Sequence, residues 1–195
     1  MIRVERLSGA ALAGALEEVA RLRIAVFRDW PYLYDGDREY EQRYLANFAE
    51  SGNAVLVGAF DGDTLVGAAT AAPMADHAED FAEALKPANL PVDKVFYLAE
   101  SVLLPEYRGQ GIGHRFFDLR EMQGYKAGAV HAVFCSVIRS DRHPLKPADY
   151  SPLDGFWASR GYAPLPGCVA RFAWPDIGHE HETEKPLQLW GRRLC

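Results

Sequence analysis

The chain lacks the features that mark membrane proteins, exported proteins and disulfide scaffolds. Its 195 residues contain no apolar run close to the roughly 20 residues that a membrane span requires. Residues 1–6 carry no hydrophobic core of a signal peptide. The three cysteines, Cys135, Cys168 and Cys195, are odd in number and widely spaced, which fits reduced thiols better than a disulfide framework. We therefore expect a cytoplasmic protein without a membrane partner.

Basic charge is also scarce. The chain has 21 Lys and Arg against 27 Asp and Glu, a net charge of −6, and no long basic run. Because nucleic-acid binding needs clustered Lys and Arg to displace counterions, we expect no nucleic-acid partner. No repeat or low-complexity segment occurs, and a hydrophobic content of 49% suffices for one sizeable core. We therefore expect one domain spanning residues 1–195.

Hydrophobic periodicity predicts a mixed α/β protein. Alternating or continuous apolar runs predict strands, and a period near 3.6 predicts helices. Strands are expected at 2–7, 54–60, 65–72, 95–105, 130–138, 168–174 and 186–190. Helices are expected at 10–28, 37–48, 79–85, 112–127 and 153–160. Because one helix separates residues 95–105 from 130–138, these two strands should be parallel neighbours.

A glycine-rich turn follows the strand at 95–105 and leads into the helix that begins at Ile112. Gly109, Gly111 and Gly113 permit a tight turn, and the first amides of a helix lack intrahelical partners, so the turn is suited to an anion. The spacing fits neither G-x-G-x-x-G nor G-x-x-x-x-G-K-[ST]. We interpret the turn as a pyrophosphate site of another class, and the alternative is a plain connection between strand and helix.

The pattern that does fit is [QR]-x-x-G-x-[GA], filled by Arg108, Gly111 and Gly113. With the preceding Leu-Pro-Glu-Tyr, it resembles the acetyl-CoA-binding signature of the GNAT superfamily of N-acetyltransferases. Residues 156–162 resemble the family's second signature, an aromatic pair, three residues and then Gly-Phe or Gly-Tyr. The order of elements also matches, so the resemblance covers nearly the whole chain. It implies the α/β GNAT fold, a mixed sheet of six to seven strands with flanking helices and splayed parallel central strands.

The resemblance implies an N-acetyltransferase that moves an acetyl group from acetyl-CoA to a primary amine by direct attack. The pyrophosphate would be bound by the turn residues Arg108, Gly109, Gln110, Gly111, Ile112, Gly113 and His114. The pantetheine arm would pair with Ser101, Val102 and Leu103, opposite Ser136 and Val137, with the acetyl carbonyl near Leu103. The thiol end would be flanked by Phe156 and Trp157.

The transfer asks for a proton acceptor, because an ammonium has no lone pair with which to attack. Glu100 is the only acidic residue in the apolar strand, and burying a carboxylate there costs free energy unless it is paired or functional. We expect Glu100 to act as general base or amine anchor, and the alternative is a structural partner for an arginine. Tyr97, on the same strand, is the second candidate.

The proton donor for the leaving thiolate is an open question. The family often places a tyrosine four residues before the glycine of the second signature, and that position here is Trp157, whose indole cannot act as an acid at neutral pH. Tyr150 and Tyr162 are the alternative donors. Otherwise the thiolate leaves unassisted or through solvent.

The acceptor side is predicted from the residues that would border the family's acceptor groove. Aromatic faces and carboxylates suit a cationic amine, although a solvated acidic helix start would look the same. These residues are Tyr32, Tyr34, Asp35, Asp37, Glu39 and Tyr40.

No metal is expected, because the sequence His179-Glu180-His181 lacks the i, i+4 spacing of a zinc site. A second class of function is a non-catalytic, CoA-binding or regulatory GNAT-like domain, and a third is transfer of a longer acyl chain. We expect a monomer or a homodimer.

Overall fold

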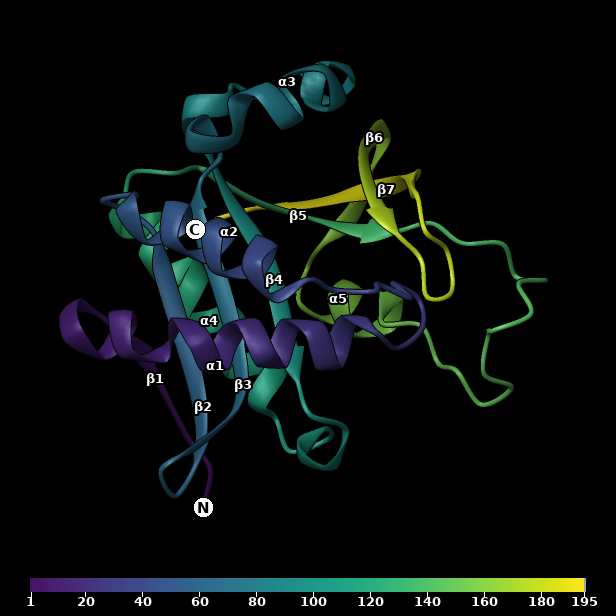
Figure 1. Ribbon diagram of the computed structural model, residues 1–195. Coiled ribbons are helices and arrows are strands. Elements are labelled where there is room, and N and C mark those ends of the chain that lie inside the picture. Colours follow the sequence, from purple (N-terminus) through teal and green to yellow (C-terminus); the bar gives the residue numbers. More distant parts are fainter. Residues whose placement is uncertain (195) are drawn as a thin grey trace.

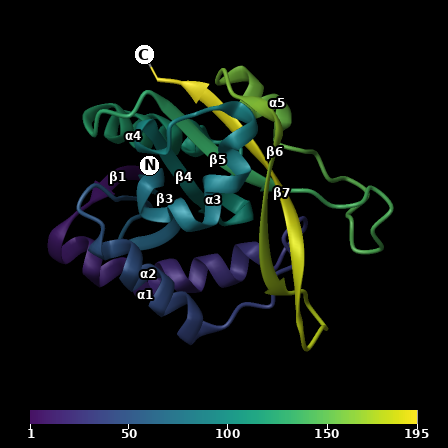
Figure 2. The same ribbon diagram turned by 90° about the horizontal axis from the view of Figure 1, so that it is seen from above.

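The computed structural model describes residues 1–194 and contains a seven-stranded sheet with helices on both faces (Figures 1 and 2). The strands are β1 (Arg3–Leu7), β2 (Val55–Asp61), β3 (Thr64–Pro73), β4 (Val95–Leu103), β5 (His131–Val137), β6 (Ala163–Pro175) and β7 (Glu182–Arg193). The helices are α1 (Gly9–Phe27), α2 (Arg38–Glu50), α3 (Ala78–Leu85), α4 (Ile112–Lys126) and α5 (Asp154–Ser159). Cys195 lies outside the described residues.

The strand order is β1-β2-β3-β4-β5-β7-β6, and every pairing is antiparallel except that of β4 with β5. Helices α1 and α2 cover one face of the sheet and α4 covers the other (Figure 2). The parallel pair arises because α4 carries the chain back across the sheet between β4 and β5. The predicted mixed α/β fold is confirmed.

Local signals placed most element boundaries correctly. Asp37 accepts a hydrogen bond from the amide of Tyr40 at 2.7 Å and so forms the N-cap of α2. The Asp61–Thr64 turn joins β2 to β3 as an antiparallel hairpin. Gly161, with φ of +82°, follows α5 in the left-handed conformation that ends many helices.

The two C-terminal strands are longer than predicted. The predicted bounds, 168–174 and 186–190, were too short at both ends. From the sequence, a strand is not expected at Pro164, Pro166 and Gly167. However, β6 is an edge strand, where a missing backbone N–H is tolerated. The register shift between Pro164 and Val169 accommodates them. The polar start of β7 belongs to the exposed end of the same hairpin.

Helix α4 approaches β4 closely at a glycine. A Cβ on Gly124 would lie 2.9 Å from Cβ, Cγ and Cδ1 of Phe96, a contact that requires atoms to move. Gly124 therefore allows α4 to lie directly on the strand that carries the central residues of the site.

We predict that Gly124→Val destabilises the protein by about 1–3 kcal/mol, because it overpacks this contact. That loss would lower the melting temperature by about 2–4 °C per kcal/mol. The matched control is Gly14→Val in α1, where an added Cβ meets nothing within 4 Å. Equal melting temperatures for the two variants would contradict the close approach.

Candidate functional site

Strand β4 contains a bulge in its middle. Its register with β3 pairs Glu100 with Thr70 but Tyr97 with Ala72, so β4 has one extra residue between these pairs. An inserted residue moves every later side chain to the opposite face of the sheet. As a result Tyr97 and Glu100, three positions apart, lie on the same face of the sheet, where α3 packs on Tyr97 and helices α1 and α2 contact Glu100.

Strands β4 and β5 separate at the same level. Their parallel pairing is limited to Val95 with His131, Phe96 with Ala132, and Tyr97 with Val133. Residues 98–103 of β4 and 134–137 of β5 have no register with one another. The predicted splay of the two central strands is confirmed, and it leaves an opening between them.

The register also indicates which amides of β4 turn toward the opening. The amide of Leu104 donates to the carbonyl of Val66 at 3.1 Å, which continues the ladder with β3. Alternate residues of an antiparallel ladder face the partner strand, so Val102 faces β3. Ser101 and Leu103 therefore direct their backbone N–H groups toward the opening.

The same reasoning applies to β5 on the other side. The amide of Ile138 donates to the carbonyl of Pro186 at 2.9 Å, so Ser136 faces β7 while Cys135 and Val137 face the opening. Of the residues expected to pair with pantetheine, Ser101, Leu103 and Val137 present backbone to the opening. Val102 and Ser136 do not.

The glycine turn presents a run of unpaired amides at the end of β4. Gly109 and Gly111 have φ of +75° and +77°, so the turn depends on glycine at both positions. The amide of Arg108 donates to Pro105 and that of Arg115 to Gly111, but among the described residues the amides of 109–114 have no acceptor. Six consecutive positions at a helix N-terminus thus offer donors to an anion.

The second signature packs against the start of α4. The ring of Phe156 lies edge-on to His114 with centroids 4.9 Å apart, and it lies 3.3 Å from where a Cβ on Gly113 would be. Trp157 instead packs against Phe134 and Trp190, with centroids 5.0 and 5.1 Å apart. Phe156 therefore lies beside the glycine turn, whereas Trp157 belongs to the core below the opening.

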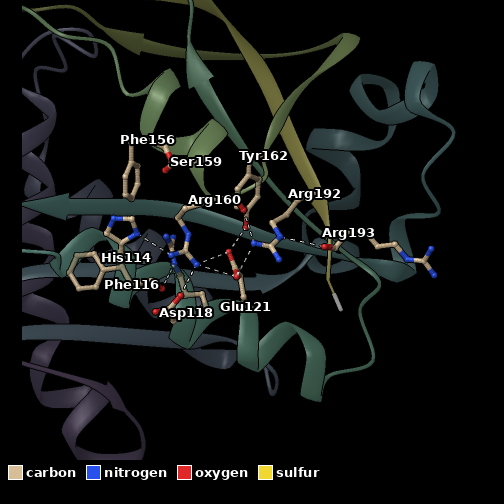
Figure 3. A network of polar contacts seen from close by, with 11 residues as sticks. His114, Phe116, Asp118, Glu121, Phe156, Ser159, Arg160, Tyr162, Arg192 and Arg193 are labelled. Atoms are coloured by element: carbon tan, nitrogen blue, oxygen red, sulfur yellow. Dashed lines mark hydrogen bonds and ion pairs between the residues drawn. The ribbon is translucent and has the colours of Figure 1, made fainter.

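Arg160, just after α5, connects the second signature to α4 (Figure 3). Its Nη2 lies 2.6 Å from a carboxylate oxygen of Asp118 and 3.3 Å from Glu121, and its Nη1 lies 3.3 Å from Nδ1 of His114. The Arg160 side chain is mostly buried. Arg160 thus holds the second signature against the first turns of α4, next to the glycine turn.

The two tyrosines considered as proton donors, Tyr162 and Tyr150, each contact other residues of the protein. Tyr162 donates its hydroxyl proton to Glu121 at 2.9 Å, and burial together with that carboxylate raises the pKa of Tyr162. Tyr150 lies in the long loop of residues 138–153, with its ring edge-on to Trp30 at 6.1 Å. The hydroxyl of Tyr162 is therefore bound to Glu121, and Tyr150 packs against Trp30 in the segment that follows α1.

On the α1–α2 face, two carboxylates share one guanidinium. Arg23 of α1 pairs with Glu41 of α2 and, through Nη1 at 2.8 Å, with Oε2 of Glu100. The hydroxyl of Tyr44 donates to the same Oε2 at 3.2 Å. Arg23, Glu41 and Glu100 are 8%, 0% and 7% exposed, so the cluster is buried. It carries one more negative than positive charge.

The cluster leaves two carboxylate oxygens without partners. Among the described residues, Oε1 of Glu41 and Oε1 of Glu100 are buried and accept no hydrogen bond. Burial by itself lowers the pKa of Arg23, but the charges of Glu100 and Glu41 outweigh burial and raise it, so the guanidinium stays charged. Oε1 of Glu100 is the oxygen that is available to another donor.

Tyr97 lies beside Cys135 across the opening, with its hydroxyl oxygen 3.5 Å from Sγ. Burial raises the pKa of Tyr97 well above its ordinary value and that of Cys135 to about 11. Both groups therefore keep their protons at neutral pH.

The predicted acceptor residues are largely engaged with the protein itself. Asp37 caps α2, and Asp35 pairs with Arg28 at 2.8 Å in an exposed contact. Tyr32 packs on Phe27 with centroids 4.6 Å apart. Tyr34 forms an isolated β-bridge with Asp176, and Glu39 and Tyr40 are exposed.

Sequence reasoning missed Arg23, Glu41 and Arg120. A signal was present for the two arginines, since Arg23 lies four residues from both Val19 and Phe27, and Arg120 lies four from Phe116. A charged residue on the apolar stripe of a helix indicates a buried partner. Glu41 carried no comparable signal, because acidic residues are common in the first turn of a helix.

The fold thus combines parallel central strands that separate from one another with a turn of unpaired amides after the first of them. The model of the Acetyltransferase (GNAT) family matches residues 9–145, and the chain belongs to this family. No curated protein sequence matches the chain.

Several solved structures share the fold. An aminoglycoside 6'-N-acetyltransferase complexed with coenzyme A is 15% identical, with a TM-score of 0.61 over 99% of this chain and 97% of that one. Protein yncA from Salmonella typhimurium, solved with its cofactor acetyl-CoA, is 10% identical, with a TM-score of 0.61 over 100% and 95%. The ribosomal-protein-S18-alanine N-acetyltransferase from Escherichia coli is 12% identical, with a TM-score of 0.58 over 100% and 94%. At these identities the likeness establishes the fold alone.

Two features are absent from the part of the chain that the structure describes. None of the helices there is both long and apolar enough to cross a membrane. No cluster of three or more His, Cys, Asp or Glu side chains among those that the structure describes has the arrangement needed to hold a metal ion.

Proposed function

We propose that the protein is an acetyl-CoA-dependent N-acetyltransferase that acts on a primary amine of a small molecule or peptide. One observation carries this proposal. The unpaired amides of residues 109–114 follow the end of β4. Earlier on the same strand, the amides of Ser101 and Leu103 face the opening between β4 and β5. A diphosphate on the turn and an extended arm in the opening would satisfy both sets of donors.

The residues fit CoA chemically. Anionic oxygens of the pyrophosphate would accept from the amides of 109–114, beside the guanidinium of Arg108, which donates through Nε to the carbonyl of Leu103 at 3.3 Å. The amide groups of pantetheine are the partners that exposed strand edges bind. The relatives solved with CoA and acetyl-CoA support this co-substrate.

The reaction itself needs three things from the chain. A carboxylate must accept the amine proton or hold the ammonium, and Oε1 of Glu100 is available for this while Oε2 is bound by Arg23 and Tyr44. A backbone N–H must stabilise the oxyanion that forms as the amine attacks the thioester carbonyl, and β4 supplies it. The electron pair of the breaking C–S bond leaves as thiolate, which Tyr150 or solvent would protonate.

The acceptor is proposed to be a cationic amine. Two carboxylates, Glu41 and Glu100, share the single guanidinium of Arg23, so the cluster has an excess of negative charge. This charge lies on the face where the acceptor would approach, next to the aromatic ring of Tyr44. Asp35 pairs with Arg28 and Asp37 caps α2, so we assign the binding of the ammonium to Glu100 and not to the start of α2. The names of the similar structures include aminoglycoside and ribosomal-protein-alanine N-acetyltransferases, which supports transfer to nitrogen but selects no acceptor. The free thiols of Cys135 and Cys168 fit a reducing cytoplasm.

The test of the function is acetyl transfer to a panel of cationic, neutral and anionic amines, measured as release of the CoA thiol. We expect turnover, with cationic amines preferred. Tight CoA binding without transfer to any amine would favour the alternative, a non-catalytic CoA-binding domain. A strongly anionic best substrate would contradict the role given to Glu100.

Gly111→Asp tests the glycine turn. The substitution adds a like charge where the pyrophosphate would lie, so CoA affinity should fall about tenfold or more, the effect of about 1.4 kcal/mol. The matched control is Gly62→Asp in the β2–β3 hairpin, which also has positive φ and free space but no anion site. Calorimetry that finds unchanged CoA affinity in folded Gly111→Asp would refute the assignment.

Glu100→Gln separates the roles open to this residue. Loss of a general base should lower kcat by roughly 10² to 10⁴, whereas loss of an ammonium anchor should chiefly raise the KM for the amine. A purely structural role would lower the melting temperature and leave both constants normal. Glu41→Gln is the control, because it loosens the same Arg23 cluster from the other side. If it reproduces the kinetic defect, Glu100 has no specific role.

A further inference from the structure

Arg120 of α4 is a buried cation without an ion pair. It is 1% exposed and ranks first in size among the side chains that are fully buried. Among the side chains that the structure describes, no carboxylate oxygen lies within 4.0 Å of its guanidinium. A buried charge costs free energy unless hydrogen bonds compensate it, so its contacts indicate what it is for.

Most of those contacts converge on the bulge of β4. Nη1 donates to the carbonyl of Thr70 at 3.2 Å and to that of Glu100 at 3.0 Å, and Nη2 donates to Oγ of Ser101 at 2.8 Å. Only Nε is used within the helix, on the carbonyl of Phe116 at 3.1 Å. The guanidinium therefore binds the carbonyls of both Thr70 and Glu100, the β3–β4 pair that borders the bulge.

The Glu100 carbonyl and the Ser101 amide belong to the same planar peptide group. The Ser101 N–H is one of the amides that face the opening. A cation at the oxygen fixes the plane of that peptide, and it polarises the group so that its N–H becomes a stronger donor. The contact to Oγ of Ser101 fixes the same residue a second time.

We propose that Arg120 is a positioning residue for acyl transfer, which holds the Glu100–Ser101 peptide so that the Ser101 N–H donates to the oxygen of the reacting carbonyl. As the amine attacks, the electron pair of the C=O bond moves onto that oxygen, and the aligned N–H stabilises it. Arg120 itself touches no substrate and exchanges no proton. The inference rests on the proposed function, because it assigns the donor for that reaction.

The charge of Arg120 is retained at neutral pH. Burial lowers its pKa to about 10, which is still well above neutrality. The ring of Phe117, 5.0 Å from the guanidinium carbon, adds a cation–π contact on the same side.

The test compares Arg120→Met, which removes charge and donors, with Arg120→Lys, which keeps the charge. Removing one oxyanion donor typically costs about 10² to 10³ in kcat, so misaligning it in Arg120→Met should cost at least about tenfold. The KM for the amine should change little, because Arg120 does not contact the Glu100 carboxylate, and the Kd for CoA should change less than kcat, because the amides of residues 109–114 and of Leu103 are untouched. Lysine should restore part of kcat. A kcat of folded Arg120→Met equal to wild type would overturn the proposal.

Two further measurements guard against a mere loss of stability. Gly124→Val weakens the same α4–β4 contact without touching the bulge, so it should lower the melting temperature and leave kcat normal. If it lowers kcat as much as Arg120→Met does, the positioning role is refuted. Should Arg120→Met not fold, Ser101→Ala removes only the Nη2 contact and should still reduce kcat severalfold, with a smaller effect on CoA affinity.

A readout that does not depend on activity keeps this inference distinct from the proposed function. Hydrogen exchange of peptides covering 98–103 should be faster in Arg120→Met than in wild type, while exchange of the glycine turn stays the same. If the wild type acetylates no amine, the function fails, and faster exchange still supports the structural half of the inference. Unchanged exchange on β4 would overturn it.

Discussion

The site depends on one irregularity, the extra residue that β4 carries opposite β3. This residue changes the face of the sheet on which each later side chain lies and the neighbouring strand toward which each later backbone N–H points. The pairing with β5 ends at the same level. If β4 alternated regularly through this point, Glu100 would point to the α4 face, and the amides of Ser101 and Leu103 would face β3. The inward amides and the face of the buried carboxylate thus follow from the bulge.

Glu100 is held from both faces of the sheet. Arg23 binds its side chain on the α1–α2 face, and Arg120 binds its carbonyl on the α4 face. Both arginines come from helices that are otherwise apolar on their buried sides. The two cations fix both the side chain and the carbonyl of this position, which suits a strand segment that has no neighbouring strand on one edge.

The parts of the fold that sequence predicted are those set by local chemistry. The Asp37 cap, the hairpin at Asp61–Thr64 and the glycine turn each follow from residues a few positions apart. The Arg23–Glu41–Glu100 cluster could not be predicted, because it joins α1, α2 and β4, and no spacing along the chain encodes that contact. The bulge was hidden for a similar reason, since the apolar run 95–105 shows no alternation whose change of phase would reveal it.

The prolines that shortened the predicted β6 have a further effect on the molecule as a whole. β6 and β1 are the two outer strands of the sheet, and an outer strand with free N–H groups is a template on which other chains aggregate. Pro164 and Pro166 remove donors from one edge, and the register shift beside them interrupts its regular spacing. The other edge is only five residues long and carries Arg3, Glu5 and Arg6. Both borders of the sheet are therefore poor sites for the addition of a foreign strand.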